Sequence, residues 1–350
     1  MKNFEAVTIS KAEWKSASNI ALVKYWGKHG NQIPANPSLS MTLKNSVTRT
    51  VMSLTEPKIP ADLLFQFEGE HAPEFEPFVH SFLKNIEGFF PFLKKYNVKI
   101  ESWNTFPHSA GIASSASSMS ALALCICDIS GEMHQGHNYN AEFYRKASEI
   151  ARIGSGSASR SVYGGFSVWG KTSLVKNSSD EWAIPLNFKV NPVFSKLQDA
   201  ILIVSSAKKK ISSTTGHRLM NHHPYAKLRY KLAQVNLEII LNALKTGNTA
   251  DFIRISENEA LGLHSLMMNS DPGFMLIEPG TIQIINKIRE YREKTGRFLC
   301  FTLDAGPNVH LLYQESDKAE ITEFINRELT VYCEHGKVLW DECGKGPVKI

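Results

Sequence analysis

The sequence has little of what marks membrane-bound and secreted proteins. No apolar run reaches the roughly 18 to 20 residues that span a bilayer, and the longest one, residues 121–129, contains Asp128. The first five residues form neither an apolar signal core nor an arginine-rich transit sequence. Only five of the 350 residues are cysteines and none form a Cys-x-x-Cys pair, which favours buried thiols over a disulfide or a zinc site. We therefore expect a soluble, cytoplasmic protein with no membrane partner.

The charge balance excludes little by itself. The 39 Lys and Arg residues exceed the 34 Asp and Glu residues by five. This excess is too small to indicate nucleic acid, so we expect no such partner, but it fits a protein that binds small anions. Hydrophobic residues make up 43% and charged residues 21% of the chain, which excludes bulk disorder and allows a full core.

The chain shows no internal repeat and no low-complexity linker. Strand-like and helix-like segments mix without a strict βαβ rhythm, which favours an α+β fold. Short apolar runs predict strands at residues 20–23, 46–54, 98–102, 166–169, 200–205, 298–303 and 309–313. A turn-rich stretch at residues 187–192 predicts a boundary between two domains, 1–190 and 191–350.

Three segments predict helices. Residues 116–129 are apolar almost throughout, as in a buried helix. Farther along, apolar side chains recur every three or four positions and indicate an amphipathic helix, at Leu228, Leu232, Val235 and Ile239. Residues 280–294 predict another helix, whose inward positions are Ile282, Ile285, Ile288 and Tyr291.

A stretch of small residues, 106–118, leads into the first of these helices. Gly111 lets the backbone pass close to a ligand, and Ser109, Ser114 and Ser115 add hydroxyl donors. The helix that follows presents unpaired N–H groups and the positive end of its dipole. The stretch suits an anion such as a triphosphate, although it is no Walker loop, and a serine-rich helix cap without a ligand is the alternative.

Three further segments carry candidate chemistry. The small-residue loop 154–161 contains Arg160, whose planar fork suits a carboxylate or phosphate unless the arginine is simply solvated. Lys24, Tyr25 and Lys28 follow a strand and offer cations to an anion, or are surface residues. Asp304 ends an apolar strand before an Ala-Gly-Pro turn, where it either acts in catalysis or caps the turn.

These segments occur in one order over nearly the whole chain, and together they resemble the GHMP kinase superfamily. Within it the chain is similar to the mevalonate diphosphate decarboxylase family. The matching motifs are residues 18–28, 36–43, 106–116, 154–161, 208–214 and 304–308. The resemblance implies a two-domain α+β fold, with a ribosomal protein S5 domain 2-like N-terminal half and a ferredoxin-like C-terminal half. It also implies an active site in the cleft between the halves, and a homodimer.

The activity that the resemblance implies is a decarboxylation dependent on ATP and Mg²⁺. 5-Diphosphomevalonate would be phosphorylated transiently on its 3-hydroxyl and converted to isopentenyl diphosphate, a step of the mevalonate pathway of isoprenoid biosynthesis. By residue match, Asp304 takes or orients the hydroxyl proton. Lys28 matches the lysine that accompanies this Asp, where it holds the carboxylate ionised or stabilises developing negative charge. Arg160 fixes the substrate carboxylate. The residues that would bind substrate are Asn19, Tyr25, Lys28, Ser155, Gly156, Ser157, Arg160, Ser213 and Ala305, with Lys24 a weaker candidate. The residues at the ATP phosphates would be Ser109, Gly111, Ser114 and Ser115, with Ser115 also nearest the metal.

Some positions bear on the choice within the superfamily. Loop 154–161 lacks the acid that mevalonate kinases carry there, and Asp304, Lys28 and Arg160 together favour a decarboxylase over a 3-kinase. Departures from the family pattern at Pro37, at His217 and at the pair His222 and His223 leave the substrate's phosphorylation state open.

Three alternatives therefore remain. They are a decarboxylase of another mevalonate derivative such as 5-phosphomevalonate, a 3-kinase, and a silent nucleotide-binding homologue. His222 and His223 could form a metal site or be packing and loop residues. We also expect one basic cleft, formed by Lys24, Lys28, Arg160, Lys208, Lys209 and Lys210.

Overall fold

The computed structural model describes residues 7–56, 62–107, 114–134, 136, 138–207 and 213–350. In this part of the chain, one sheet has the strand order β14-β1-β4-β7-β5-β6, with β8 joining β4 to β9. Its strands are β1 (Thr8–Val23), β4 (Ser38–Thr55), β5 (Leu63–Phe67), β6 (Glu70–His71), β7 (Asn97–Asn104), β8 (Phe166–Trp169), β9 (Ala183–Pro185) and β14 (Val348–Lys349). A short ribbon pairs β2 (Lys28–His29) with β3 (Ile33–Pro34).

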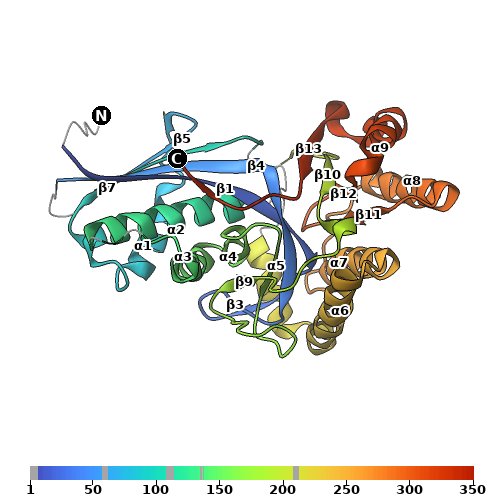
Figure 1. The fold of residues 1–350 in the computed structure, drawn as a ribbon, viewed down its shortest axis with the longest axis horizontal. Helices are drawn as coiled ribbons and strands as arrows, with labels where there is room; N and C mark the ends of the chain where they lie inside the picture. Colours follow the sequence, from blue (N-terminus) through green and yellow to red (C-terminus); the bar gives the residue numbers. More distant parts are fainter. Residues whose placement is uncertain (1–6, 57–61, 108–113, 135, 137, 208–212) are drawn as a thin grey trace.

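Helices from the first half of the chain cover one face of this sheet (Figure 1). They are α1 (Glu76–Ile86), α2 (Ser114–Met133), α3 (Ala141–Gly154) and α4 (Ala158–Ser161). The buried helix α2 packs against β1, where Trp14 Nε1 donates to Asp128 Oδ2 at 2.9 Å. Asp128, the charge inside the apolar run, is therefore a buried acceptor that holds the helix to the sheet.

The second sheet has the order β11-β12-β10-β13. Its strands are β10 (Leu197–Leu202), β11 (Leu299–Thr302), β12 (Val309–Gln314) and β13 (Val338–Glu342). The helices around it are α6 (Ala226–Thr246), α7 (Thr249–Met268), α8 (Pro279–Thr295) and α9 (Lys318–Phe324), whereas the short helix α5 (Ser213–Leu219) lies nearer α4 and β9 (Figure 1). Side chains alternate along β10: Leu202 packs with α8 and α9, whereas Ile201 packs with α6 and α7. Both faces of the sheet are covered, which explains its continuous apolar runs.

The α+β expectation is confirmed, and each predicted strand overlaps an observed one. The predicted helices correspond to α2, α6 and α8. One predicted helix face, that of α8, was wrong in detail, and the apolar stripe noted on α6 lies largely toward solvent. Leu228, Leu232 and Val235 of α6 are about half exposed, because Leu237 and Ile240 on its other side face the core. On α8, Ile282 is exposed and Ile284 is buried in its place.

The long strand β1 connects the two halves of the molecule. Its first residues alternate between buried and exposed, because only one face of the sheet is covered there. From Ser16 onward every residue is buried, since the strand runs on toward α7 and β11 (Figure 1). The last residues of β1 belong to the same core as α6 and α7, so the end of this strand is where both halves meet.

The chain returns to the first sheet at its end. Strand β14 pairs with β1 through Lys349 and Trp14. The boundary between domains 1–190 and 191–350 stays a prediction. None of the helices in the described ranges combines the length and the apolar character needed to cross a membrane.

Candidate active site

A cavity of about 240 Å³ opens where β1 ends, between the α3–α4 turn, α5 and the loop after β11. Most of the predicted site residues line it, namely Asn19, Tyr25, Lys28, Ser115, Ser155, Gly156, Ser157, Arg160, Asp304 and Ala305. Ser213 is the first residue of α5. Ser109, Gly111 and Lys208–Lys210 lie outside the described residues. Three of the expected basic residues, Lys24, Lys28 and Arg160, do share this cavity.

Asp304 stands just beyond β11, where the strand gives way to a tight turn. Gly306 donates its backbone N–H to the Asp304 carbonyl at 2.7 Å, and His264 Nε2 lies 3.0 Å from the same oxygen. The turn thus fixes the backbone of Asp304, while its side chain remains 27% exposed to the cavity. A fixed carboxylate with access to a ligand can accept a proton from it.

The lysine that contacts Asp304 in the structure is Lys24, whereas the family resemblance implied Lys28 at this place. Lys24 Nζ donates to Asp304 Oδ1 at 3.1 Å, and the lysine side chain is only 1% exposed. Burial lowers the pKa of Lys24, an effect that the charges of Asp304 and Glu259 partly offset. Lys28 lines the same cavity but donates from Nζ to Gln32 Oε1 at 2.9 Å. The strand ends at Val23, so Lys24 turns inward while Lys28 lies in the β2–β3 ribbon.

A buried ion pair holds the backbone of Lys24 in place. Glu259 of α7 accepts the Lys24 backbone N–H at 2.8 Å and forms a bidentate pair with Arg229 of α6, at 2.7 Å for both bonds. Arg229 Nη2 also donates to the Lys24 carbonyl at 2.9 Å. Nothing in the sequence pattern pointed to Glu259 or Arg229, because each lies in a helix far from the motifs.

Polar side chains hold Arg160 at the wall of the cavity. Its Nε donates to Asn19 Oδ1 at 3.3 Å and its Nη1 donates to Ser38 Oγ at 2.5 Å. Asn19 Nδ2 in turn donates to the carbonyl of Ser157 at 3.0 Å, which ties the arginine to its own loop. Burial lowers the pKa of Arg160 to about 10, so it stays charged at neutral pH. Nη2 has no hydrogen-bond partner among the described residues, so one side of the fork remains for a ligand.

The glycine at 156 is required by the close packing of two aromatic rings. A Cβ on Gly156 would lie 2.7 Å from Trp169 Cη2 and 2.9 Å from Tyr25 Oη. The rings of Tyr25 and Trp169 are 4.6 Å apart between centroids. Gly156 therefore allows the 154–161 loop to approach Tyr25 and form one wall of the cavity.

His217 was noted in the sequence only as a departure from the family pattern, yet it lines the cavity. It lies on α5 and its Nδ1 accepts the backbone N–H of Gly27 at 3.0 Å. Burial, reinforced by the charge of Lys28, lowers its pKa to about 3. The ring is therefore neutral at physiological pH.

The N-terminus of α2 adjoins the cavity. Ser115 Oγ lies 3.2 Å from Ser155 Oγ, which brings the predicted phosphate loop next to the 154–161 loop. The first turn of α2 contains no acidic residue, so no negative charge there opposes an anion at the positive end of the helix dipole. Ser114 lies at the other side of this helix start, in a neighbouring cavity.

That neighbouring cavity, of about 210 Å³, is lined by four phenylalanine rings among other residues, and it shares Ser115 and Phe78 with the first. Its other aromatic residues are Phe65, Phe67 and Phe75. They come from β5 and from the start of α1, elements that the sequence patterns did not predict. A flat apolar ring fits such a pocket, next to the helix start that suits phosphates.

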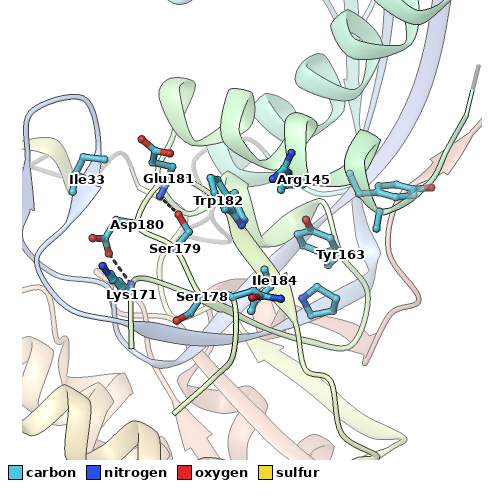
Figure 2. A pocket seen from close by; sticks show the side chains of 14 residues that line it. Ile33, Arg145, Tyr163, Lys171, Ser178, Ser179, Asp180, Glu181, Trp182 and Ile184 are labelled. Atoms are coloured by element: carbon cyan, nitrogen blue, oxygen red, sulfur yellow. Dashed lines mark hydrogen bonds between the residues drawn. The ribbon is translucent and has the colours of Figure 1, made fainter. Parts of the chain in front are cut away.

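A larger cavity of about 980 Å³ lies elsewhere, along α3 and residues 177–185, and Figure 2 shows its side chains. Arg145 lies over the ring of Trp182, and the Lys171 backbone N–H donates to Asp180 at 2.7 Å. None of the predicted site residues line this cavity, so its size does not make it the site.

His222 and His223 lie in different environments. His223 is buried and its Nε2 lies 3.0 Å from the Leu266 carbonyl, whereas His222 is exposed. In the described ranges no three His, Cys, Asp or Glu side chains gather as a metal group would need. The packing interpretation therefore holds for His223.

Comparison with known proteins identifies the family. Residues 16–180 match the model of the diphosphomevalonate decarboxylase-like N-terminal domain, and residues 200–343 match that of the mevalonate 5-diphosphate decarboxylase C-terminal domain. This chain belongs to the diphosphomevalonate decarboxylase family. A diphosphomevalonate decarboxylase of Ganoderma lucidum is 29% identical over 91% of this chain and 82% of its own.

Solved structures of the decarboxylase family share the whole fold. The mevalonate diphosphate decarboxylase of Staphylococcus aureus superposes with a TM-score of 0.83 at 28% identity, covering 97% of this chain and 98% of its own. A structure of the protein MDDEF in complex with MVAPP, AMPPCP and magnesium gives a TM-score of 0.82 at 28% identity, with the same coverage. The expected two-domain fold of this family is therefore confirmed for the chain.

Proposed function

We propose that the protein converts 5-diphosphomevalonate and ATP into isopentenyl diphosphate, carbon dioxide, ADP and phosphate, with Mg²⁺ as a cofactor. The observation that carries the proposal is the meeting of Asp304, Lys24 and Arg160 in one cavity beside the start of α2. Family membership agrees with this reaction, and the MDDEF complex with MVAPP, AMPPCP and magnesium supports ATP and Mg²⁺ as the cofactors.

The first step needs a base at the 3-hydroxyl. A tertiary alcohol leaves poorly, so its oxygen first attacks the γ-phosphorus of ATP and ADP departs. Asp304 accepts the hydroxyl proton in this step. Lys24 keeps the carboxylate of Asp304 ionised and oriented, because it donates to Oδ1 at 3.1 Å from a buried position.

The second step breaks two bonds. The C3–O bond opens and phosphate leaves with the bonding electrons. The C1–C2 bond then breaks, and its electron pair forms the C2=C3 double bond while C1 departs as carbon dioxide. Arg160 supports this step by holding the substrate carboxylate through Nη2, since Asn19 and Ser38 already fix the rest of the guanidinium.

The nucleotide occupies the pocket at the start of α2. Ser114, Ser115 and the helix N–H groups contact the phosphates, with Ser109 and Gly111 as further phosphate contacts implied by the family motif. Ser115 Oγ would help to hold Mg²⁺ beside the phosphates, where the metal would neutralise negative charge during phosphoryl transfer. The adenine ring enters the aromatic pocket of Phe65, Phe67, Phe75 and Phe78.

We infer that the protein forms a homodimer through α6. Tyr225, Leu228, Leu232 and Val235 are between 47% and 55% exposed and form one stripe along this helix. In an antiparallel pair about a two-fold axis, Leu232 faces Val235 of the second copy and Lys231 flanks its Glu238. Apolar and charged positions are then both self-complementary, as an isologous interface requires.

We also propose that the protein is cytoplasmic. All five cysteines are unpaired and four of them are buried, which agrees with a reducing compartment.

The division into domains 1–190 and 191–350 remains part of the proposal, and the two family models lie on either side of residue 190.

Replacing Asp304 by Asn is expected to lower kcat at least about a thousandfold, because the base is lost, while ATP binding changes less than about threefold. The assay supplies ATP and Mg²⁺ with mevalonate, its 5-phosphate or its 5-diphosphate, and follows ADP and carbon dioxide. Glu293→Gln, an exposed position, is the control. ADP without carbon dioxide from the wild type would identify a 3-kinase, and undiminished turnover in D304N would refute the role of Asp304.

Replacing Phe78 by Ala is expected to raise the KM for ATP about tenfold, because a base–aromatic contact contributes roughly 1–3 kcal/mol. The KM for the mevalonate substrate should change far less. Phe89→Ala removes a similarly exposed ring outside the pocket and serves as the control. Equal effects of F78A and F89A would contradict the adenine assignment.

Replacing Leu232 by Glu is expected to convert the dimer into a monomer, because two carboxylates would oppose the apolar stripe of the partner. Sedimentation velocity at micromolar concentration measures the change. Val331→Glu introduces the same charge at another exposed apolar position and should leave the dimer intact. A monomeric wild type, or a dimeric L232E, would rule out this interface.

A further inference from the structure

His217 is a cavity residue that the reaction steps above do not use. Its ring lies between Tyr25 and Trp26, with centroid distances of 4.4 and 4.7 Å. The adjacent Gly216 makes room for this arrangement, since a Cβ there would lie 2.5 Å from Trp26 Cζ2. The imidazole is therefore held by neighbouring aromatic rings and its orientation is fixed by packing.

One hydrogen bond also fixes the position of the imidazole proton. The backbone N–H of Gly27 donates to Nδ1 at 3.0 Å, so Nδ1 carries no proton. Because the ring is neutral, its proton is on Nε2. No partner contacts Nε2 among the residues that the structure describes. His217 thus presents one oriented N–H donor at the wall of the cavity.

The charged residues in the cavity indicate which end of the substrate lies near the His217 donor. Asp304, Lys24 and Arg160 act on one another at the end where the proton transfer and the carboxylate belong. The charge that acts on His217 is Lys28 instead. A substrate with its carboxylate and hydroxyl at Asp304 therefore extends its phosphate end toward Lys28 and His217.

We propose that His217 Nε2–H donates to the terminal phosphate of the substrate's 5-diphosphate, beside Lys28 Nζ, and thereby selects a diphosphate over a monophosphate. This inference rests on the proposed function. A 5-monophosphate is one phosphoryl group shorter, so the His217 donor is left without an acceptor, and the Lys28 ammonium keeps Gln32 as a partner but has no anion beside it. Sites built to bond a polar group discriminate strongly against analogues that lack it.

Two substitutions test the roles of the two nitrogens of the His217 ring separately. His217→Asn keeps an acceptor near Nδ1 for Gly27 and loses the distal donor. His217→Gln keeps a donor near Nε2 and loses the acceptor. We expect H217N to raise the KM for 5-diphosphomevalonate about tenfold, as for one lost hydrogen bond to a charged group, with kcat within about threefold. H217Q should stay close to the wild type in both constants.

Melting temperatures show whether the variants fold. If H217N does not, His217→Leu replaces it, since Leu fills the space between the rings without a donor, and the same increase over H217Q is expected. Equal KM values in the donor-containing and donor-free variants would overturn the role of His217. A wild type that releases no carbon dioxide from the diphosphate would overturn the proposed function itself, so the two failures are distinguishable.

Discussion

The ion pair between the buried Lys24 and the partly exposed Asp304 is the interaction on which the rest of the site depends. It joins the end of β1 to the loop after β11, and so ties the N-terminal sheet to the C-terminal half. Burying charges is unfavourable unless each one is paired. The Arg229–Glu259 pair lies beside the Lys24 backbone, and the buried cation Arg160 lies near Asp304. Arg160 forms no salt bridge with a carboxylate among the described residues, which gives a physical reason for a substrate carboxylate to bind beside it.

Much of the site could be predicted from the sequence, because small-residue loops and a carboxylate at a strand end mark their chemistry locally. Arg160, Asp304 and the 154–161 loop lie where those motifs indicate. The choice between Lys24 and Lys28 could not be made, since the two lysines are four residues apart and only the path of the chain after Val23 decides which one turns inward. The face of α6 was equally undecidable, because its sequence offers one apolar stripe to the core and another to solvent.

Other parts of the site depend on contacts between distant segments and leave no local pattern. The aromatic pocket combines β5, α1, β7 and α2. The Arg229–Glu259 pair comes from two helices that pack against each other beside Lys24. His217 is prominent in sequence only as an unexpected residue, and its role follows from the hydrogen bond of Gly27 and the rings on either side. We propose that the chemistry takes place at the Asp304 end of this cavity, and that the Lys28 end determines which phosphorylated substrate fits.

The most direct test of the central interaction is a double-mutant cycle on kcat/KM with Lys24→Met, Asp304→Asn and the double variant. Residues that act as one unit give losses that do not add. If Lys24 acts through Asp304, the double variant loses no more activity than D304N alone, within about threefold. If the fold-losses of the two single variants multiply in the double variant, the two residues act independently and the account of this site is wrong.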